Sequence, residues 1–250
     1  MRQYPTRTIL TGITQPGIQR RCGATRPILQ RRILTLLFLV ALALLPAQGL
    51  YAHTINYALE KAPVQNVVWF YLKMGVRHII PLGTDHILFV VSLCLISTRI
   101  KAILWQATAF TVAHSITLAL SMKNIIVAPS PVVEPIIALS ILFVAAENIL
   151  LDGLKPWRIG IVFMFGLIHG MGFASALNET GLPRNQFFTS ILSFNAGVEL
   201  GQIAVITATF LLLIIPFGRK SWYKQRVVYP VSGLIACIAA FWTIQRVFFT

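Results

Sequence analysis

Six long apolar segments dominate the chain from residue 84 onward and limit the folds open to it. They are Thr84–Ser97, Ala102–Met122, Pro131–Leu151, Trp157–Leu177, Phe187–Pro216 and Val227–Phe249. A helix needs about 20 apolar residues to cross a bilayer, and every segment except the first reaches that length. With 56% hydrophobic and 11% charged residues, the chain carries more apolar surface than one soluble core can bury. The sequence therefore predicts an all-α, polytopic transmembrane helix bundle of about six spans.

The region before these spans divides into two parts. Residues 1–52 hold seven of the 21 Lys and Arg residues, and the apolar run Ile33–Leu45 follows the last of them. A basic stretch followed by an apolar run is typical of a secretory leader, and an uncleaved anchor explains it equally well. Residues 53–80 are predicted to form a short extracytoplasmic and amphipathic segment, and residues 81–250 the helix bundle.

The net charge of +14 is best interpreted as a topology signal, not as an indication of nucleic-acid binding. Cytoplasmic loops of membrane proteins carry an excess of Lys and Arg. Alternating the spans places most of the loop cations on one side: Arg99, Lys101, Lys155, Arg158, Arg219, Lys220, Lys224 and Arg226. Only Lys123 and Arg184 fall in the opposite loops. We therefore expect the first group in the cytoplasm, with residue 53 and the C-terminus extracytoplasmic.

Polar side chains inside the predicted spans are few and chemically alike. Four of the seven acidic residues and three of the five histidines lie there, and a fourth histidine lies just before the first span. The candidates are His78, Asp85, His86, His114, Glu134, Glu147, Asn148, His169, Asn195, Glu199 and Gln202. An unpaired charge at the bilayer centre costs at least about 2.5 kcal/mol, so such residues are functional-site candidates by default.

The depths of these residues predict that most of them converge. At about 1.5 Å of rise per residue, the four histidines, Asp85 and Glu134 lie in the outer half of the membrane. Glu147 and Asn148 lie in the inner third of their span. Asn195, Glu199 and Gln202 stand at i, i+4 and i+7, so they form one polar stripe that faces protein.

Glycines in the fourth span favour close helix contact. Gly166 and Gly170 are four residues apart and flank His169. Small residues at this spacing let another helix approach closely. We therefore expect the small face of this span to bring His169 near a neighbouring helix.

Imidazole and carboxylate groups without thiolates suit divalent ions such as nickel, cobalt or zinc. The predicted ligands are His78, Asp85, His86, His114, His169 and Glu199. Pathway or supporting roles are predicted for Glu134, Glu147, Asn148, Asn195 and Gln202. The alternative is that these groups are hydrogen-bonded contacts that hold helices together.

Four motifs together resemble the HupE/UreJ family. They are Gly83-Thr-Asp-His-Ile-Leu-Phe, Phe110-Thr-Val-Ala-His-Ser-Ile-Thr-Leu, Phe165-Gly-Leu-Ile-His-Gly-Met-Gly-Phe-Ala and Phe194-Asn-Ala-Gly-Val-Glu-Leu-Gly-Gln. The resemblance covers roughly residues 67 to 205. It implies a bacterial inner-membrane protein of six or seven helices, regarded as a nickel permease and associated with hydrogenase and urease maturation. The family's His- and Asp-bearing motif matches His78, Asp85 and His86.

Three functions remain open from the sequence. The first is a permease for nickel or cobalt, in which the outer ligands capture the ion and Glu199 and Glu147 pass it inward. The second is an intramembrane zinc-dependent hydrolase of a lipid-type substrate, in which three histidines hold zinc and Asp85 or Glu199 activates water. The third is a non-catalytic accessory of a metalloenzyme maturation system. Of these we favour the permease over the enzyme.

Overall fold

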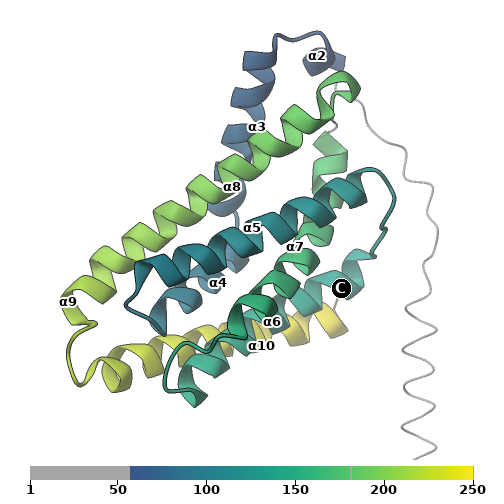
Figure 1. Cartoon of the computed structure of the whole chain (residues 1–250). Helices are drawn as coiled ribbons and strands as arrows, with labels where there is room; N and C mark the ends of the chain where they lie inside the picture. The colour runs from purple at the N-terminus through teal and green to yellow at the C-terminus, as the bar shows by residue number, and fades with distance from the viewer. Residues whose placement is uncertain (1–56, 181, 250) are drawn as a thin grey trace, which may run out of the picture. The chain divides into compact units, whose positions relative to one another are not determined.

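The computed structural model describes residues 57–180 and 182–249, so the predicted leader or anchor in residues 1–52 lies outside the described part (Figure 1). The described residues form helices and no strand. In chain order the helices are α2 (Tyr57–Glu60), α3 (Val64–Ile79), α4 (Thr84–Leu95), α5 (Ile100–Met122), α6 (Ser130–Leu150), α7 (Arg158–Thr180), η1 (Arg184–Gln186), α8 (Phe187–Thr209), η2 (Phe210–Ile214), α9 (Ile215–Phe217), η3 (Lys224–Val228) and α10 (Tyr229–Phe248).

The all-α, multi-pass membrane fold predicted from the sequence is confirmed, but the count of six spans is not. Four helical runs in the described part are long and apolar enough to cross a membrane: Ile100–Met122, Ser130–Leu150, Arg184–Phe217 and Lys224–Phe248. The α3–α4 pair passes the same test only if both helices count as one span, and it is bent by 68°. The apolar part of α7, Arg158–Ala174, is shorter than the others.

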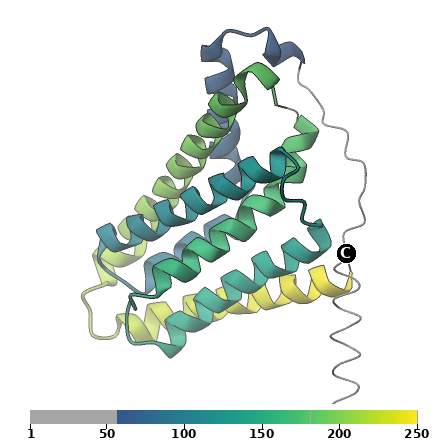
Figure 2. The ribbon, with the colours of Figure 1, turned by 45° about the vertical axis from the view of Figure 1, so that its right-hand side comes forward.

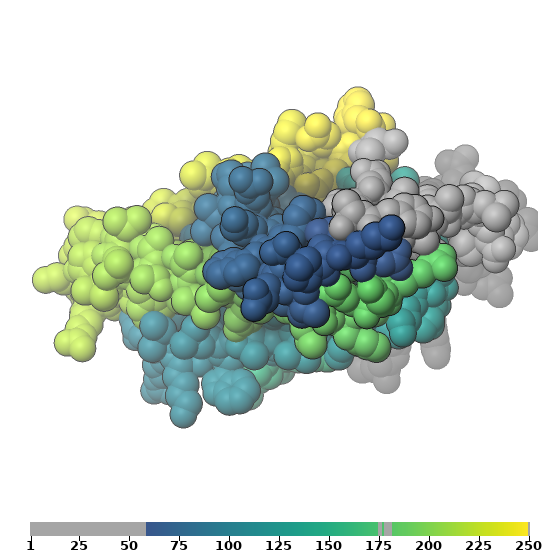
Figure 3. Space-filling view, turned by 90° about the horizontal axis from the view of Figure 1, so that it is seen from above, coloured from purple at the N-terminus to yellow at the C-terminus, as the bar shows by residue number. Residues whose placement is uncertain are grey.

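Three pairs of helices lie side by side along much of their length: α3 with α8, α5 with α7, and α6 with α10 (Figures 1 and 2). The space-filling view from above shows the blue atoms of α2 and α3 directly against the green atoms of α8 (Figure 3). The short helix α4 contacts α5, α6 and α8. Its Phe89, Val90 and Leu93 are fully buried, so α4 is the centre of the bundle.

Glycines set the closest crossings. A Cβ atom on Gly75 of α3 would lie 2.0 Å from the Phe194 carbonyl oxygen of α8, and one on Gly197 would lie 2.2 Å from the Leu72 oxygen. On α7, a Cβ on Gly170 would lie 2.3 Å from the His114 oxygen of α5. The predicted close approach through the small face of the fourth span is therefore confirmed, because only glycine leaves room for these backbones.

Large apolar side chains on the outer faces point away from the protein. Trp105, Leu150, Leu192 and Leu212 are each at least 60% exposed. Lipid chains are as apolar as leucine, so these side chains cost nothing at a lipid-facing surface. The outward faces thus match a bilayer, while the polar candidates of the sequence lie inside.

The basic loops that follow α4, α6 and α9 meet at one end of the bundle. Lys224 donates to the Leu151 carbonyl oxygen at 3.1 Å and pairs with Asp152. The hydrogen bond from Lys224 holds the pKa of the exposed Asp152 carboxyl below its ordinary value. The Tyr223 hydroxyl donates to the Leu95 carbonyl oxygen at 3.5 Å. These contacts group the three loops, as the alternation of spans predicts.

Candidate metal centre

The break between α3 and α4 places two histidines opposite each other. Ile80 precedes Pro81 and is extended (φ −123°, ψ 117°), because a residue before proline is driven out of the helical region. The chain resumes as helix at Thr84. His78 therefore lies in the last turn of α3 and His86 in the first turn of α4, with ring centroids 4.6 Å apart.

His114, from the middle of α5, completes a triangle. Its ring centroid lies 6.1 Å from that of His78 and 6.1 Å from that of His86. One ligand nitrogen from each of the three side chains lies within 4.8 Å of the others, a spacing that one metal ion can bridge. His114 is fully buried and His86 is 6% exposed. The convergence predicted from depth is thus observed for all three.

His169 of α7 is the fourth member, and its ring lies 5.2 Å from that of His86. We call His78, His86, His114 and His169 the histidine cluster. His169 lies beside the triangle of ligand atoms and not within it.

The free nitrogen atoms of the cluster are its most informative feature. In all four histidines Nε2 is buried and has no hydrogen-bond partner. Nδ1 of His169 donates to the Phe165 carbonyl oxygen at 2.9 Å, which leaves the Nε2 lone pair of the neutral ring open. Nδ1 of His114 lies 3.3 Å from Oδ1 of Asn195 and is oriented in the same way. Such second-side contacts are typical of metal-ligating histidines.

Asp85 is paired with Arg246, a cation for which the sequence predicts no role. Nη2 of Arg246, near the end of α10, lies 2.8 Å from the Asp85 carboxylate, and both side chains are about one-fifth exposed. Nη1 of Arg246 donates to the Glu134 main-chain oxygen at 3.2 Å. The structure thus places Asp85 at the edge of the cluster, where Arg246 compensates the charge of its carboxylate. A lone cation in an apolar last span was the signal for this pair.

The polar stripe of α8 faces protein, as predicted, and the helix that it faces is α5. Asn195 meets His114, the Thr108 hydroxyl donates to Glu199 at 2.8 Å, and the Thr111 hydroxyl donates to Gln202 at 3.2 Å. Only Asn195 of the stripe contacts the histidine cluster through a hydrogen bond. Glu199 and Gln202 therefore lie deeper along the α5–α8 interface than the cluster.

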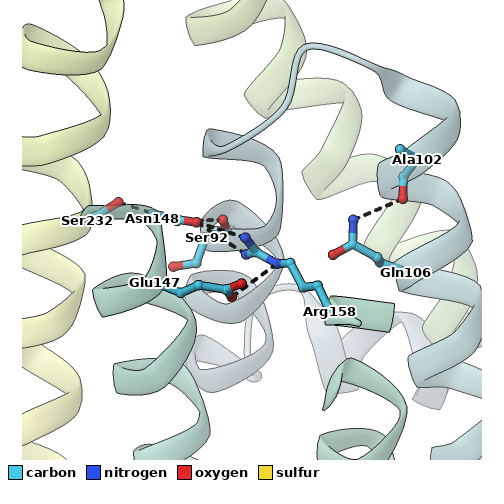
Figure 4. A network of polar contacts seen from close by, with 7 residues as sticks. All are labelled: Ser92, Ala102, Gln106, Glu147, Asn148, Arg158 and Ser232. Atoms are coloured by element: carbon cyan, nitrogen blue, oxygen red, sulfur yellow. Dashed lines mark hydrogen bonds and ion pairs between the residues drawn. The ribbon is translucent and has the colours of Figure 1, made fainter. Parts of the chain in front are cut away.

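A second buried polar group lies at the other end of α6, and Figure 4 shows it from close by. Nε of Arg158 lies 3.4 Å from Oε2 of Glu147, an ion pair without hydrogen-bond geometry. Both terminal nitrogens of Arg158 donate to Oδ1 of Asn148 at 3.2 Å. Nδ2 of Asn148 donates to the Ser92 carbonyl oxygen at 2.8 Å and lies 3.4 Å from the Ser232 hydroxyl. We call these five residues the Arg158 network.

The sequence predicts Arg158 in a cytoplasmic loop, but the structure places it in a helix. It begins α7 and its side chain is fully buried. The loop between α6 and α7 is short, so the start of α7 returns next to the end of α6, where Glu147 lies. A carboxylate in the last turn of one span and an arginine in the first turn of the next were the available signal.

A cavity of about 890 Å³ leads to the histidine cluster between α3, α4, α6, α7 and α10. His78, His86 and His169 line it, and His114 lies behind them. Asp85, Glu134 and Arg246 also line it. Imidazole donors suit nickel, cobalt, copper and zinc, whereas thiolates are absent from the cluster. The described residues thus place imidazole donors of this kind beside an accessible cavity.

The fold and the site define a multi-pass membrane protein with a buried histidine centre that opens to one cavity. The chain belongs to the HupE/UreJ family, because the sequence model of the HupE / UreJ protein family matches residues 54–246. No curated protein and no solved structure matches the chain. The family suggests a metal transport or accessory role, with nickel or cobalt as the metal.

Proposed function

We propose that this protein is a permease that binds a divalent transition-metal ion, nickel or cobalt, at the histidine cluster and translocates it across the bacterial inner membrane. The observation that carries the proposal is the set of four buried Nε2 atoms that have no hydrogen-bond partner. A structural role for these side chains predicts that their nitrogens bond to neighbouring helices. The alternative of hydrogen-bonded contacts between helices accounts for Nδ1 of His114, which meets Asn195 of α8. It does not account for Nδ1 of His169, which bonds to its own helix, and it leaves every Nε2 unexplained.

Energetics supports a ligand at this place. A buried donor or acceptor without a partner costs about 1–3 kcal/mol, and four of them lie within one small volume. A divalent cation that accepts three lone pairs removes this cost for each ligand it binds. Three uncharged imidazoles also attract a divalent cation less strongly than carboxylates do. Weaker attraction suits an ion that must leave the site again.

The proposed route runs from the cavity to the basic loops. Asn195, Glu199 and Gln202 extend inward from His114 along α8. We assign Glu199 the role of a ligand that passes the ion inward, and Asn195 and Gln202 the supporting roles predicted from the sequence. The clustered basic loops support a cytoplasmic location for that end, with residue 53 and the C-terminus extracytoplasmic. Delivery to a metalloenzyme maturation system is the corresponding role for the cytoplasmic side.

The zinc-hydrolase alternative is favoured by one observation, the triangle of His78, His86 and His114 beside a large cavity. A catalytic zinc keeps three protein ligands and an open position, and it needs a group that activates water. Both proposed activators have other partners: Asp85 pairs with Arg246, and Glu199 accepts a hydrogen bond from Thr108. We therefore rank the permease first.

The test combines metal binding and uptake. Metal-stripped protein in detergent is titrated with nickel and cobalt, and cells expressing the chain accumulate radioactive nickel. We expect His86→Ala to abolish both signals. Ser140→Ala is the matched control, because it removes a buried hydroxyl that bonds only to its own helix at 2.7 Å. Uptake by His86→Ala equal to that of wild type refutes the permease, and tightly bound zinc without any uptake supports the hydrolase.

A further inference from the structure

The cavity that leads to the histidine cluster is much larger than a metal ion. Its volume is about 890 Å³. Six waters of hydration at about 30 Å³ each give a hydrated ion of roughly 200 Å³. Pockets for organic ligands have volumes of roughly 300–1,000 Å³. The cavity therefore has the size of a site for an organic molecule.

The charges on the cavity wall also do not match a free cation. Lys73, Arg77 and Arg246 line it, together with the carboxylates of Asp85 and Glu134. Arg246 and Asp85 neutralise each other in an ion pair. Within the described residues Lys73 and Arg77 form no ion pair, so two unpaired cations remain against one carboxylate. The wall of a route for a bare divalent ion is expected to carry an excess of negative charge, because positive charge on the wall opposes the entry of a cation.

The two cations are placed to act together on one ligand. Lys73 and Arg77 are four residues apart on α3, so they lie on the same face of this helix. The next residue, His78, carries one of the free Nε2 atoms. One wall of the cavity thus presents two cations in successive turns of α3, and His78 directly follows the second of them.

Apolar side chains form much of the remaining wall. Phe70 and Met74 of α3, Ile137 of α6 and Phe173 of α7 line the cavity. The Phe173 ring lies 3.9 Å from that of His78. These groups offer no ligand to an ion, but they can pack against the carbon skeleton of an organic molecule.

We propose that the cavity takes the metal as an anionic chelate of a small carboxylate-bearing organic molecule, with Lys73 and Arg77 binding the carboxylate charge while the histidines bind the metal. The inference rests on the proposed function and names the form in which the metal arrives. Imidazole nitrogens replace chelator oxygens one at a time, because nitrogen ligands are preferred by nickel and cobalt. The chelator then leaves through the wide cavity and the metal stays.

The experiment separates the chelate from the free ion. Total nickel and citrate are raised together so that free nickel stays constant while nickel citrate increases, and uptake of radioactive nickel is measured in cells. We expect uptake by wild type to rise with the chelate. The double variant Lys73→Gln/Arg77→Gln is expected to lose about tenfold of this uptake, because each hydrogen bond to a charged group contributes substantially. Ethylenediamine, which forms cationic nickel complexes, should give no rise at the same free nickel.

The matched control is Lys61→Gln/Arg184→Gln, which removes the same charge from exposed positions outside the cavity. If this control loses as much uptake as the cavity variant, the effect is one of general surface charge and the inference is wrong. It is also wrong if uptake follows free nickel alone. Both outcomes leave the permease proposal intact. If wild type and His86→Ala take up the same amount of nickel under every condition, the permease proposal itself is wrong.

Discussion

The histidine cluster and the Arg158 network are both buried inside the bundle, but they differ in how their polar groups are compensated. In the network, Arg158 is the counter-charge of Glu147, and its terminal nitrogens donate to Asn148, which donates to the Ser92 carbonyl oxygen. Both carboxylate oxygens of Glu147, Nε of Arg158 and the Ser92 hydroxyl nevertheless have no hydrogen-bond partner. In the cluster no carboxylate of the described residues pairs with a histidine, every Nε2 lacks a partner, and three ligand atoms lie within 4.8 Å of one another. The network is thus linked within the protein by charge compensation, whereas the cluster directs several imidazoles at one point.

The largest expected effect is on the network. Arg158→Leu leaves Glu147 buried without its counter-charge, and breaking a buried ion pair in this way costs about 3–5 kcal/mol. The free energy of unfolding, measured by SDS titration in mixed micelles, should fall by that amount. The double variant Glu147→Leu/Arg158→Leu should recover more than half of the loss, since apolar replacement of both partners is often neutral.

Lys155→Ala is the control for this experiment, because Lys155 is an exposed cation in the loop just before Arg158. It should leave the stability nearly unchanged. A double variant as unstable as Arg158→Leu alone contradicts the view that charge compensation is the purpose of the network. Nickel binding by whatever protein remains folded should be unaffected in either variant.

The second effect concerns the cluster and has the opposite pattern. His86→Leu removes an unpaired buried nitrogen, so the metal-free protein should unfold within about 1 kcal/mol of wild type. Nickel at 100 times its dissociation constant should stabilise wild type by about 2.7 kcal/mol and the variant not at all. Thermal unfolding in detergent with and without nickel measures both numbers. If the metal-free variant is less stable than wild type and nickel still stabilises it, the cluster has a structural role.

The Asp85–Arg246 pair lies between the two cases, because it is partly exposed and lines the cavity. A double-mutant cycle of Asp85→Asn and Arg246→Gln should give a coupling of about 1 kcal/mol in unfolding free energy. If Asp85 also binds the metal, Arg246→Gln should strengthen nickel binding by freeing the carboxylate. Unchanged affinity in Arg246→Gln and in Asp85→Asn removes Asp85 from the ligand set.

The smallest effect is expected for the bond between Thr108 and Glu199. Thr108→Val removes one hydrogen bond to a half-buried carboxylate and should cost about 1 kcal/mol or less of stability. If Glu199 passes the ion inward, uptake should fall in Glu199→Gln and change less in Thr108→Val. Equal uptake in wild type and Glu199→Gln excludes Glu199 from the route.

Much of the site was predictable from depth and spacing along the helices. The convergence of His78, His86 and His114 follows from their similar depth, and the contact of Asn195 with His114 follows from the polar stripe of α8. Helix periodicity fixes the side of each helix on which a residue lies. It needs no knowledge of the tertiary structure.

The pairing of charges was not predictable in the same way. Arg158 lies at the predicted cytoplasmic end of its helix, where a basic residue is an ordinary topology signal. Arg246 stands out as a lone cation in an apolar span, but only tertiary packing shows that the two arginines pair with Glu147 and Asp85. The sequence predicts the amphipathic segment and the short first span as separate elements. It does not predict that α3 and α4 count together as one bent span, because neither helix alone has the length or apolarity of a span. Both differences have one cause: the length and apolarity of a single helix do not show its contacts with other helices.

The bend between α3 and α4 has a consequence for the entropy of binding one ion with two histidines. His78 and His86 are only eight positions apart, so an ion held by both closes a very small chelate ring of backbone. The entropy lost on ring closure grows only with the logarithm of the ring's length, and this ring is near the short end. Two of the three histidines therefore belong to one local segment, and α5 supplies the third, His114. An ion bound to both histidines would tie the end of α3 to the start of α4 across the break between them.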